Sequence, residues 1–155
     1  MDEAAEQVAK TLQNMNAIGK VVEFTTPMPT AAHAAAQLGC PIGAIANSLV
    51  FTVDDEPLLV IASGAHRVDL DKIASLLELP KPRRASKEFV LEHTGQPVGG
   101  VAPIGHPRPI RTVIDTALGE YNRVWAGAGS KYTMFPSSFD ELVRLTGGTP
   151  AEVGE

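Results

Sequence analysis

A chain of 155 residues, of which 44% are hydrophobic, is long enough for one domain with its own core, and no apolar run in it is long enough to span a membrane. Thirteen Lys and Arg against 18 Asp and Glu leave a formal net charge of -5, which argues against tight non-specific binding of nucleic acid, because such binding depends on neutralising phosphates. A single cysteine, Cys40, excludes an internal disulfide framework, and because we see no signal peptide we expect a reducing cytoplasm.

The start of the chain predicts two helices with a short strand between them. Residues 2–14 carry apolar side chains at helical spacing behind an acidic start, which is typical of an outer helix. Residues 20–25 alternate and are β-branched, which favours a strand. Thr30 suits the N-cap of a helix over 31–38, and Gly39 suits its left-handed C-cap.

The middle of the chain predicts a β-hairpin followed by two helices. The apolar runs 45–53 and 58–62 flank a polar turn, so we expect them to pair as a central hairpin. The spacing of apolar residues predicts a helix over 68–79. Ser86 suits the N-cap of a further helix over 87–93.

The last part of the chain predicts three short strands and a helix. Strands are expected over 110–114, 124–127 and 132–135, the last two around a glycine-rich turn. A helix from 138 to 145 opens with a capping box. We expect residues 149–155 to form a frayed tail.

Interspersed helices and strands, with adjacent strands close enough to form hairpins, predict the α+β class, a mixed α/β fold with a largely antiparallel or mixed sheet. No internal repeat, low-complexity segment or linker divides the sequence. We therefore expect one domain over 1–155, with an N-terminal helical extension over 1–20 and a tail over 148–155.

The stretch TGQPVGGVAPIGHP, over 94–107, lies between two regular segments and holds four glycines and three prolines. Proline restricts the backbone, while Gly99 and Gly100 allow positive φ and the close approach of another group, so we expect a loop of fixed shape. Such a loop suits backbone N–H groups that point at a carbonyl, an oxyanion or a phosphate. The alternative, which composition alone favours, is a rigid surface crossover without a ligand.

Several other catalytic and metal-binding patterns are absent from the sequence. There is no Gly-x-Ser-x-Gly elbow and no Gly-x-x-x-x-Gly-Lys loop, which argues against a covalent hydrolase of that kind and against a nucleoside triphosphatase. The histidines lie far apart, without a Cys or His partner at metal-ligand spacing, so we predict no metal and no cofactor. They are His33, His66, His93 and His106.

Five stretches, in their order along the chain, together resemble one known family. They are TAAHAAAQLG over 30–39, AIANSLVF over 44–51, GAHRVDL over 64–70, TGQPVGGVAPIG over 94–105 and VID over 113–115. The chain resembles the YbaK and prolyl-tRNA synthetase-associated editing domain from about residue 25 to residue 147. Each stretch alone is weakly specific, but five in the correct order are specific.

The resemblance implies a single domain with a mixed, partly barrel-like sheet flanked by helices, and a pocket between sheet and helices. It also implies a free-standing deacylase that acts in trans on mischarged aminoacyl-tRNA, removing a small wrong amino acid such as Ala, Ser or Cys from tRNA-Pro. On this interpretation water is the nucleophile and a substrate group such as a ribose hydroxyl assists. The backbone of Gly99, Gly100 and Val101 would then hold the substrate carbonyl.

Two residues depart from the pattern of that family. Its members usually have Lys before the Ser or Thr of the first central strand, where this chain has Asn47 before Ser48. Asparagine offers an amide donor and acceptor but no charge, and its alternative interpretation is a polar residue facing solvent. Tyr132 stands where several members have His. The alternative function is therefore a non-catalytic tRNA- or synthetase-binding module that has lost hydrolysis with the lysine.

Three further residues each have a functional and a plain interpretation. His106 suits a general base, because its charge changes near neutral pH, or a surface residue of the loop. Asp115 suits the orientation of water or of the substrate amino group, or the cap of a helix over 116–120. Ser130 suits a pocket wall opposite the 94–107 loop, or a plain hairpin turn.

The predicted site residues form three sets. The candidate catalytic residues are Asn47, Gly99, Gly100, Val101 and His106, and the candidate substrate-binding residues are Thr30, Ser48, Pro103, Gly105, Asp115, Gly129, Ser130 and Tyr132. Basic residues that suit weak contact with the phosphates of an acceptor stem, or else a solvated surface, are Lys81, Arg83, Arg84, Arg108 and Arg111. Because positive charge is scarce, a synthetase or elongation factor is a possible partner in delivering the aminoacyl-tRNA.

Overall fold

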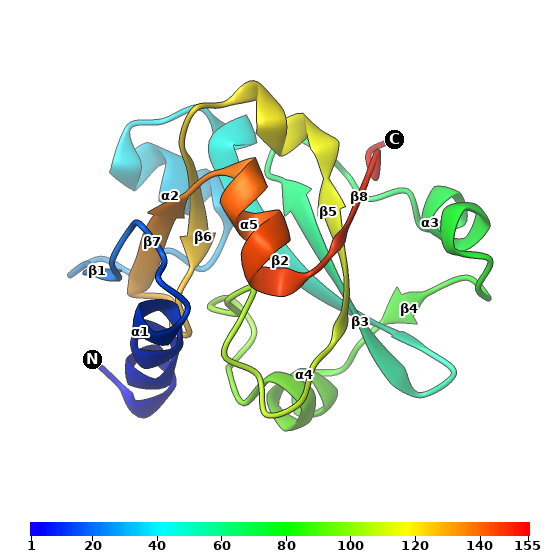
Figure 1. Cartoon of the computed structure of the whole chain (residues 1–155), viewed down its shortest axis with the longest axis horizontal. Helices are drawn as coiled ribbons and strands as arrows, with labels where there is room; N and C mark the ends of the chain where they lie inside the picture. Colours follow the sequence, from blue (N-terminus) through cyan, green and yellow to red (C-terminus); the bar gives the residue numbers. More distant parts are fainter.

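Helices and strands are interspersed along the chain, as the sequence predicts for the α+β class. The computed structural model describes all residues from 1 to 155 (Figure 1). The helices are α1 (Glu3–Asn14), α2 (Ala31–Leu38), α3 (Leu70–Leu77), α4 (Lys87–Thr94) and α5 (Phe139–Thr146), with 3-10 helices η1 (Ile42–Ala44) and η2 (Thr116–Glu120). The strands are β1 (Val22–Glu23), β2 (Ile45–Val53), β3 (Glu56–Ser63), β4 (Arg83–Arg84), β5 (Arg111–Asp115), β6 (Val124–Gly127), β7 (Thr133–Ser137) and β8 (Thr149–Ala151).

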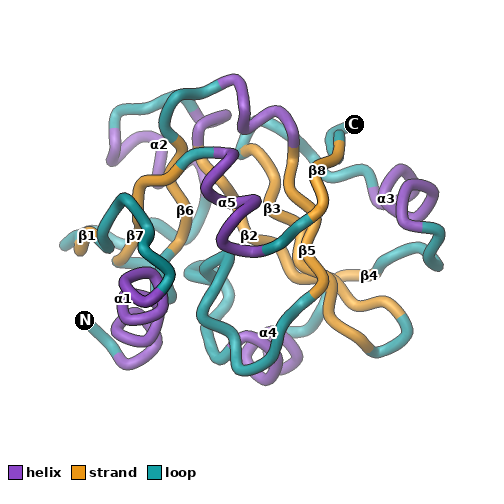
Figure 2. Tube along the Cα trace, viewed as in Figure 1, coloured by secondary structure: helices purple, strands orange, loops and turns teal.

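All of the strands belong to one mixed sheet, with the order β1-β7-β6-β2-β3-β5-β8 and with β4 added to β2. Figure 2 shows the strands crossing the middle of the molecule and the helices lying around them. β2 and β3 form the predicted antiparallel hairpin, in which Ala46 lies opposite Ser63. Asp54 and Asp55 both have positive φ, which two-residue hairpin turns need in order to match the twist of the strands. Because β2 pairs with β6 and β3 with β5 in parallel, the sheet is mixed.

The edge of β2 that faces away from β3 has two short neighbours and a gap between them. Within β2, only Ile45 and Ala46 pair with β6, and only Phe51 and Thr52 pair with β4. Residues 47–50 therefore have no strand beside them on this edge. This gap positions the site described below.

The main core lies between the sheet, α1, α5 and the 94–107 loop. β3 is buried along most of its length, since Leu58 to Ser63 have almost no exposed surface. α1 was predicted as an outer helix, and it covers this core with one apolar face. Ala5, Val8 and Leu12 of that face are buried, while its acidic residues face outward. The 1–20 segment is therefore anchored to the rest of the domain.

The prediction of a frayed tail after residue 148 is wrong. β8 pairs in parallel with β5, with Val113 opposite Thr149. Beyond it, Val153 is fully buried and its carbonyl accepts a hydrogen bond from the N–H of Asp69 at 2.7 Å. Backbone pairing to an existing edge strand needs no apolar pattern in the added strand, and so the sequence TPAEVGE gives little sign of it.

Local sequence signals set the helix ends as predicted. The side chains of Thr30, Ser86 and Ser138 each accept a hydrogen bond from the backbone N–H three residues further on. Gly39 and Gly147 end their helices in the left-handed conformation. None of the helices combines the length and the apolar character that crossing a membrane requires.

Candidate functional site

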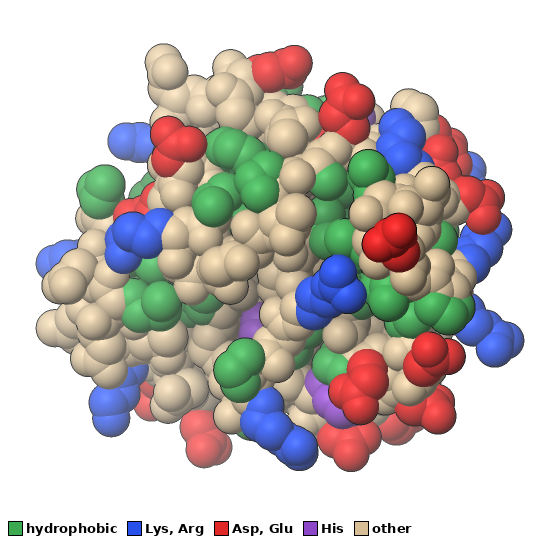
Figure 3. All heavy atoms as spheres, turned by 45° about the vertical axis from the view of Figure 1, so that its right-hand side comes forward, with side chains coloured by type: hydrophobic (Ala, Val, Ile, Leu, Met, Phe, Trp, Pro, Cys, Tyr) green, Lys and Arg blue, Asp and Glu red, His purple; other side chains and the backbone are tan.

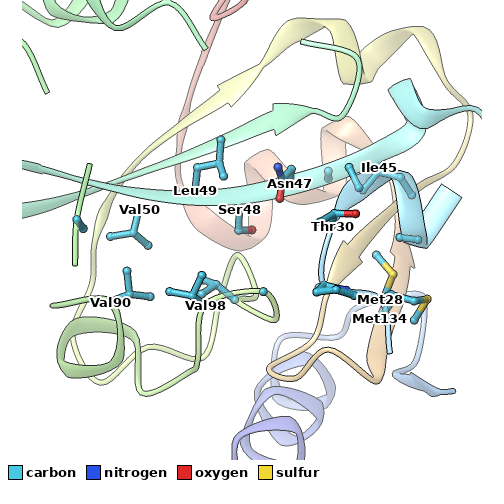
Figure 4. A pocket seen from close by; sticks show the side chains of 18 of the residues that line it. Met28, Thr30, Ile45, Asn47, Ser48, Leu49, Val50, Val90, Val98 and Met134 are labelled. Carbon is cyan, nitrogen blue, oxygen red and sulfur yellow. The ribbon is translucent and has the colours of Figure 1, made fainter. Parts of the chain in front are cut away.

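A cavity of about 600 Å³ opens at the gap beside β2 (Figure 4). Its walls come from β2, α2 and the segment before it, α4, β4 and the 94–107 loop, and most of its lining is apolar. The lining residues are Met28, Pro29, Thr30, Ala31, Ala34, Ile45, Ala46, Asn47, Ser48, Leu49, Val50, Phe51, Arg84, Ala85, Lys87, Val90, Val98, Gly99, Val101, Gly127 and Met134. The resemblance-based expectation of a pocket between sheet and helices matches this arrangement.

Alternation along β2 divides its side chains between two sides of the strand. Figure 4 shows Ser48 and Val50 pointing toward Val90 and Val98, whereas Leu49 points to the other side of β2. The Oγ of Ser48 is shut off from solvent, and no protein group forms a hydrogen bond with it. Asn47 also lines the cavity, so the interpretation of a plain surface residue is not supported at this position.

The 94–107 loop turns sharply where it meets the cavity. The N–H of Gly100 donates to the carbonyl of Pro97 at 3.1 Å, and Gly99 has φ of 93°, a pattern of type II turns with glycine in the third position. Gly99 and Val101 line the cavity, and no protein acceptor takes the N–H of either. Of the three backbone donors proposed from the sequence, two are therefore free and one, Gly100, is used inside the turn.

The loop is held in shape by a glutamine side chain that the sequence analysis did not single out. The Oε1 of Gln96 accepts from the N–H of Ala102 at 2.6 Å, and its Nε2 donates to the carbonyl of Ile104 at 3.1 Å. Gln96 is 2% exposed. Thr94 Oγ1 accepts from the N–H of Gln96 and donates to the carbonyl of Val90, which ties the loop to α4. The available signal was a polar amide in a loop whose other residues up to Gly105 are small, apolar, Gly or Pro.

The turn between β6 and β7 lies directly behind the 94–107 loop. The N–H of Gly129 donates to the carbonyl of Gly100 at 2.7 Å. A Cβ added to Gly100 would lie 2.5 Å from the backbone of Ser130. Ser130 Oγ is hydrogen bonded to Thr133. The β6–β7 turn was predicted to form the pocket wall opposite the 94–107 loop. It packs instead against the loop itself, and neither Gly129 nor Ser130 lines the cavity.

His106 lies away from the cavity and is half-buried. Its Nε2 donates to the carbonyl of Ala102 at 2.9 Å. Burial lowers the pKa of the imidazole below its ordinary value, and the hydrogen bond to Ala102 opposes this shift. A general base must reach the substrate, and His106 does not line the cavity, so the structure does not support this role for it.

The lowered pKa of His106 predicts a pH dependence of stability. Between the lowered pKa and the ordinary value near 6.5, the unfolded chain binds more protons than the folded chain. The contribution of neutral His106 to the free energy of unfolding is therefore fully present above about pH 6.5. It is lost as the pH falls through the pKa of His106 in the folded protein. We expect the fall in the free energy of unfolding from pH 7 to pH 5 to be smaller in His106→Gln, measured by urea denaturation. Equal slopes for both proteins would contradict this role.

Asp115 caps the helical turn over 116–120, which is the structural alternative that the sequence indicated for it. Its carboxylate accepts from the N–H of Ala117, which caps η2, and from the N–H of Ser63, both at 3.0 Å. His66 Nδ1 donates to the same carboxylate at 2.7 Å. Asp115 is fully buried and does not line the cavity, so it joins β3, β5 and η2.

Three more predicted substrate-binding residues lie outside the cavity. Pro103 is buried in the loop, and Gly105 takes a φ of 86° with α1 close beside it at Val8. Tyr132 is 38% exposed, and Lys131 Nζ lies 5.7 Å from the centre of its ring. Of the predicted substrate-binding set, Thr30 and Ser48 line the cavity.

Only part of the predicted basic set lies at the cavity. Arg84 lines it together with Lys87, which the sequence analysis missed, and Arg83 is next to Arg84 in β4. Lys81 forms an ion pair with Asp71 at 3.3 Å. The others, Arg108 and Arg111, do not line the cavity. On the face shown in Figure 3, basic side chains are separated by acidic and neutral ones, which fits local rather than broad contact with an anion.

This geometry defines a domain with a small-molecule pocket, mostly apolar, with free backbone donors on one wall. No three His, Cys, Asp or Glu side chains are arranged to hold a metal ion. Donors of this kind suit an ester carbonyl that becomes negative during hydrolysis.

The chain belongs to the aminoacyl-tRNA editing domain family, whose model matches residues 25–145. It is 32% identical over 123 residues to the uncharacterized protein YwhH of Bacillus subtilis, covering 79% of this chain and 78% of YwhH. It is 31% identical to a proline–tRNA ligase of Lysinibacillus sphaericus, covering 81% of this chain but only 22% of the ligase. A solved structure of a candidate trans-editing enzyme for prolyl-tRNA synthetase superposes with a TM-score of 0.93 at 36% identity, over 100% of this chain and 99% of the other. The resemblance to editing domains associated with prolyl-tRNA synthetase is thereby confirmed.

Proposed function

We propose that this chain is a free-standing deacylase that hydrolyses the ester bond of mischarged aminoacyl-tRNA. The observation that carries the proposal is the pair of free N–H groups of Gly99 and Val101 on the wall of the pocket. The similarity to a candidate trans-editing enzyme supports it. In this proposal the substrate is a small wrong amino acid such as Ala, Ser or Cys on tRNA-Pro, and the protein works in the cytoplasm.

The reaction needs no covalent intermediate with the protein. Water adds to the ester carbonyl carbon, and the carbonyl oxygen becomes negative within reach of the N–H groups of Gly99 and Val101. The bond from carbon to the ribose oxygen then breaks, the ribose oxygen takes a proton, and the amino acid leaves. A neighbouring ribose hydroxyl is our candidate for relaying that proton. Removal of one backbone donor of this kind typically lowers a rate by about 10²- to 10³-fold.

Two exposed basic residues on the wall of the pocket suit the charged part of the substrate. Arg84 and Lys87 line the pocket and are exposed, and Arg83 lies beside them. They suit the phosphates next to the aminoacylated end of the tRNA. With a formal net charge of -5, the remainder of the surface adds little to tRNA binding, so delivery by a synthetase or elongation factor belongs to the same proposal.

Release of labelled amino acid from a small panel tests the proposed function. The panel is Ala-, Ser-, Cys- and Thr-tRNA, each charged on the proline acceptor and on its own tRNA. Release of at least one of these by the wild type would support a deacylase and name its substrate. Binding of the tRNA without release from any of them would instead favour a non-catalytic module, in which Asn47 replaces the usual lysine.

Asn47→Lys is expected to change the rate and the substrate profile of release by about tenfold or more. Asn47 lines the pocket, and a lysine there adds a point charge that binds the tRNA terminus or the aminoacyl group. Steady-state kinetics over the same panel measures the effect, with the exposed Asn14→Lys of α1 as a control that adds the same charge elsewhere. An unchanged rate and profile would rule out a role for residue 47 in recognising the substrate.

A further inference from the structure

The edge of β2 at the pocket carries main-chain groups that no neighbouring strand uses. We propose that this edge recognises the adenine base of the terminal adenosine of the tRNA. The carbonyl of Ser48 accepts a hydrogen bond from the exocyclic amino group of adenine, and the N–H of Val50 donates to the ring nitrogen beside it. This inference rests on the proposed deacylase function and deepens it, because it assigns a subsite to the nucleotide that carries the amino acid.

The register of the β2–β3 hairpin determines which main-chain groups of β2 face the pocket. The N–H of Gly64 donates to the carbonyl of Ile45 at 2.8 Å, across the hairpin. In an antiparallel pair every second residue bonds to the neighbouring strand. Counting from Ile45 along the register, Ser48 and Val50 therefore direct their N–H and C=O groups away from β3, toward the open edge.

The carbonyl of Ser48 and the N–H of Val50 have no partner within the chain. On the open edge β6 pairs with β2 only as far as Ala46, and β4 pairs with it only from Phe51 onward. Neither group takes part in the backbone hydrogen bonds of loops, turns and caps. An acceptor and a donor two residues apart on one strand edge are thus left for a ligand.

The pocket meets β2 along this edge and not along one face of the strand. Seven consecutive residues, Ile45 to Phe51, line it, whereas contact with one face would involve every second residue. Ser48 is half-buried although its Oγ is shut off from solvent. The accessible surface of Ser48 therefore belongs to its main chain and Cβ, and the ligand meets these atoms and not the hydroxyl.

The size and the lining of the pocket suit a nucleoside in addition to an amino acid. Pockets of about 600 Å³ hold ligands of the size of a drug molecule, and a small amino acid alone is much smaller. Val90 and Val98 lie across from Val50 and offer apolar surface to the face of a base (Figure 4). Val98 is 55% exposed, so a base at the open edge has apolar surface to cover.

Positive charge lies at the same end of the gap as Val50. Arg84 lies opposite Phe51 in the β2–β4 pair, and Lys87 lines the pocket with it. These two side chains suit the 5′-phosphate of a nucleotide whose base lies at the open edge. No Asp or Glu is among the residues that line the pocket, so no carboxylate there repels the phosphate.

The order of acceptor and donor on the edge distinguishes adenine from hypoxanthine, the base of inosine. Adenine has an amino donor next to a ring nitrogen that accepts. Hypoxanthine has a carbonyl acceptor and a ring N–H donor in the same places, so like groups would face each other across the contact. Purine riboside lacks the amino group and keeps the ring acceptor. We expect adenosine to be preferred over inosine by about tenfold or more, with purine riboside between them.

Binding of the free nucleotides AMP and IMP to the wild type tests this subsite without hydrolysis. AMP should bind about tenfold more tightly than IMP or better, and its titration should shift the NMR signal of the Val50 amide. Val50→Pro removes only the donor, at an edge position whose N–H no strand uses, and should lose most of the preference for AMP. Val50→Ala is the matched control, because it shortens the side chain and keeps the N–H. Circular dichroism establishes that both variants are folded.

The same comparison on the substrate uses tRNA-Pro that ends in adenosine, purine riboside or inosine, each charged with the same amino acid. The wild type should lose about tenfold or more in kcat/KM from the adenosine end to the inosine end. Because these substrates differ only in one base, the comparison in the wild type stands even where a variant does not fold.

The outcomes separate this inference from the proposed function. Equal affinity for AMP and IMP, no binding of AMP, or an undiminished preference in folded Val50→Pro would overturn the adenine subsite. Release of amino acid at equal kcat/KM from adenosine and inosine ends would also overturn it, while supporting the deacylase. Preferential binding of AMP without release of amino acid from any tRNA would support the subsite and contradict the deacylase function.

Discussion

Replacement of Gly100 by alanine is expected to lower the rate of aminoacyl-tRNA hydrolysis by about a hundredfold or more. The added Cβ would lie 2.5 Å from the Cα and carbonyl carbon of Ser130, which are backbone atoms that cannot turn aside. The loop must therefore move away from the β6–β7 turn. The N–H groups of Gly99 and Val101 move with it, because these two residues directly flank Gly100 in the loop.

The measurement is single-turnover release of the amino acid from saturating aminoacyl-tRNA, which isolates the chemical step from binding. Gly119→Ala is the matched control, since a Cβ there would lie 3.7 Å from the ring of Phe139, an ordinary contact, and Gly119 needs no positive φ. Circular dichroism at the assay temperature establishes that both variants are folded. A folded Gly100→Ala variant with the wild-type rate would contradict the catalytic role of the loop backbone.

Local order was predictable from the sequence wherever one residue type has one strong preference. Thr30 and Ser138 cap helices, Gly39 ends one, and the polar turn between the two central strands closes a hairpin. β8 was missed because its pairing with β5 depends on backbone atoms that every sequence has. The gap beside residues 47–50 was missed for a related reason. Periodicity identifies a strand but does not say how far its neighbours extend.

The candidate site was predictable as a loop but not as a set of donors. Glycine and proline indicated a fixed turn at 94–107, and the turn is there. Which N–H group the turn itself consumes depends on the residue at which the turn begins. Because this turn begins at Pro97, it removed Gly100 from the donors and left Gly99 and Val101. His106 and Asp115 have side chains that suit catalysis, but both bond to protein groups outside the pocket. Residue chemistry alone cannot separate these two uses.

Gln96→Leu is expected to lower the free energy of unfolding by about 2–5 kcal/mol. Leucine has a similar size but removes both hydrogen bonds, which leaves the N–H of Ala102 and the carbonyl of Ile104 buried and unpaired. Each such group costs about 1–3 kcal/mol. For a chain of this length, the midpoint of thermal unfolding should fall by roughly 2–4 °C per kcal/mol. Urea denaturation with linear extrapolation gives the free energy directly.

Two comparisons make this prediction specific to the loop. Gln13→Leu, on the exposed face of α1, makes the same chemical change without burial and should alter the free energy of unfolding by less than about 0.5 kcal/mol. Gln96→Leu should also reduce aminoacyl-tRNA hydrolysis, because Val101 lies next to Ala102, whose N–H the glutamine holds. A variant as stable as Gln13→Leu would show that the loop keeps its shape without Gln96. The shape of the 94–107 loop would then come from its glycines, its prolines and the bond from Gly129 to Gly100.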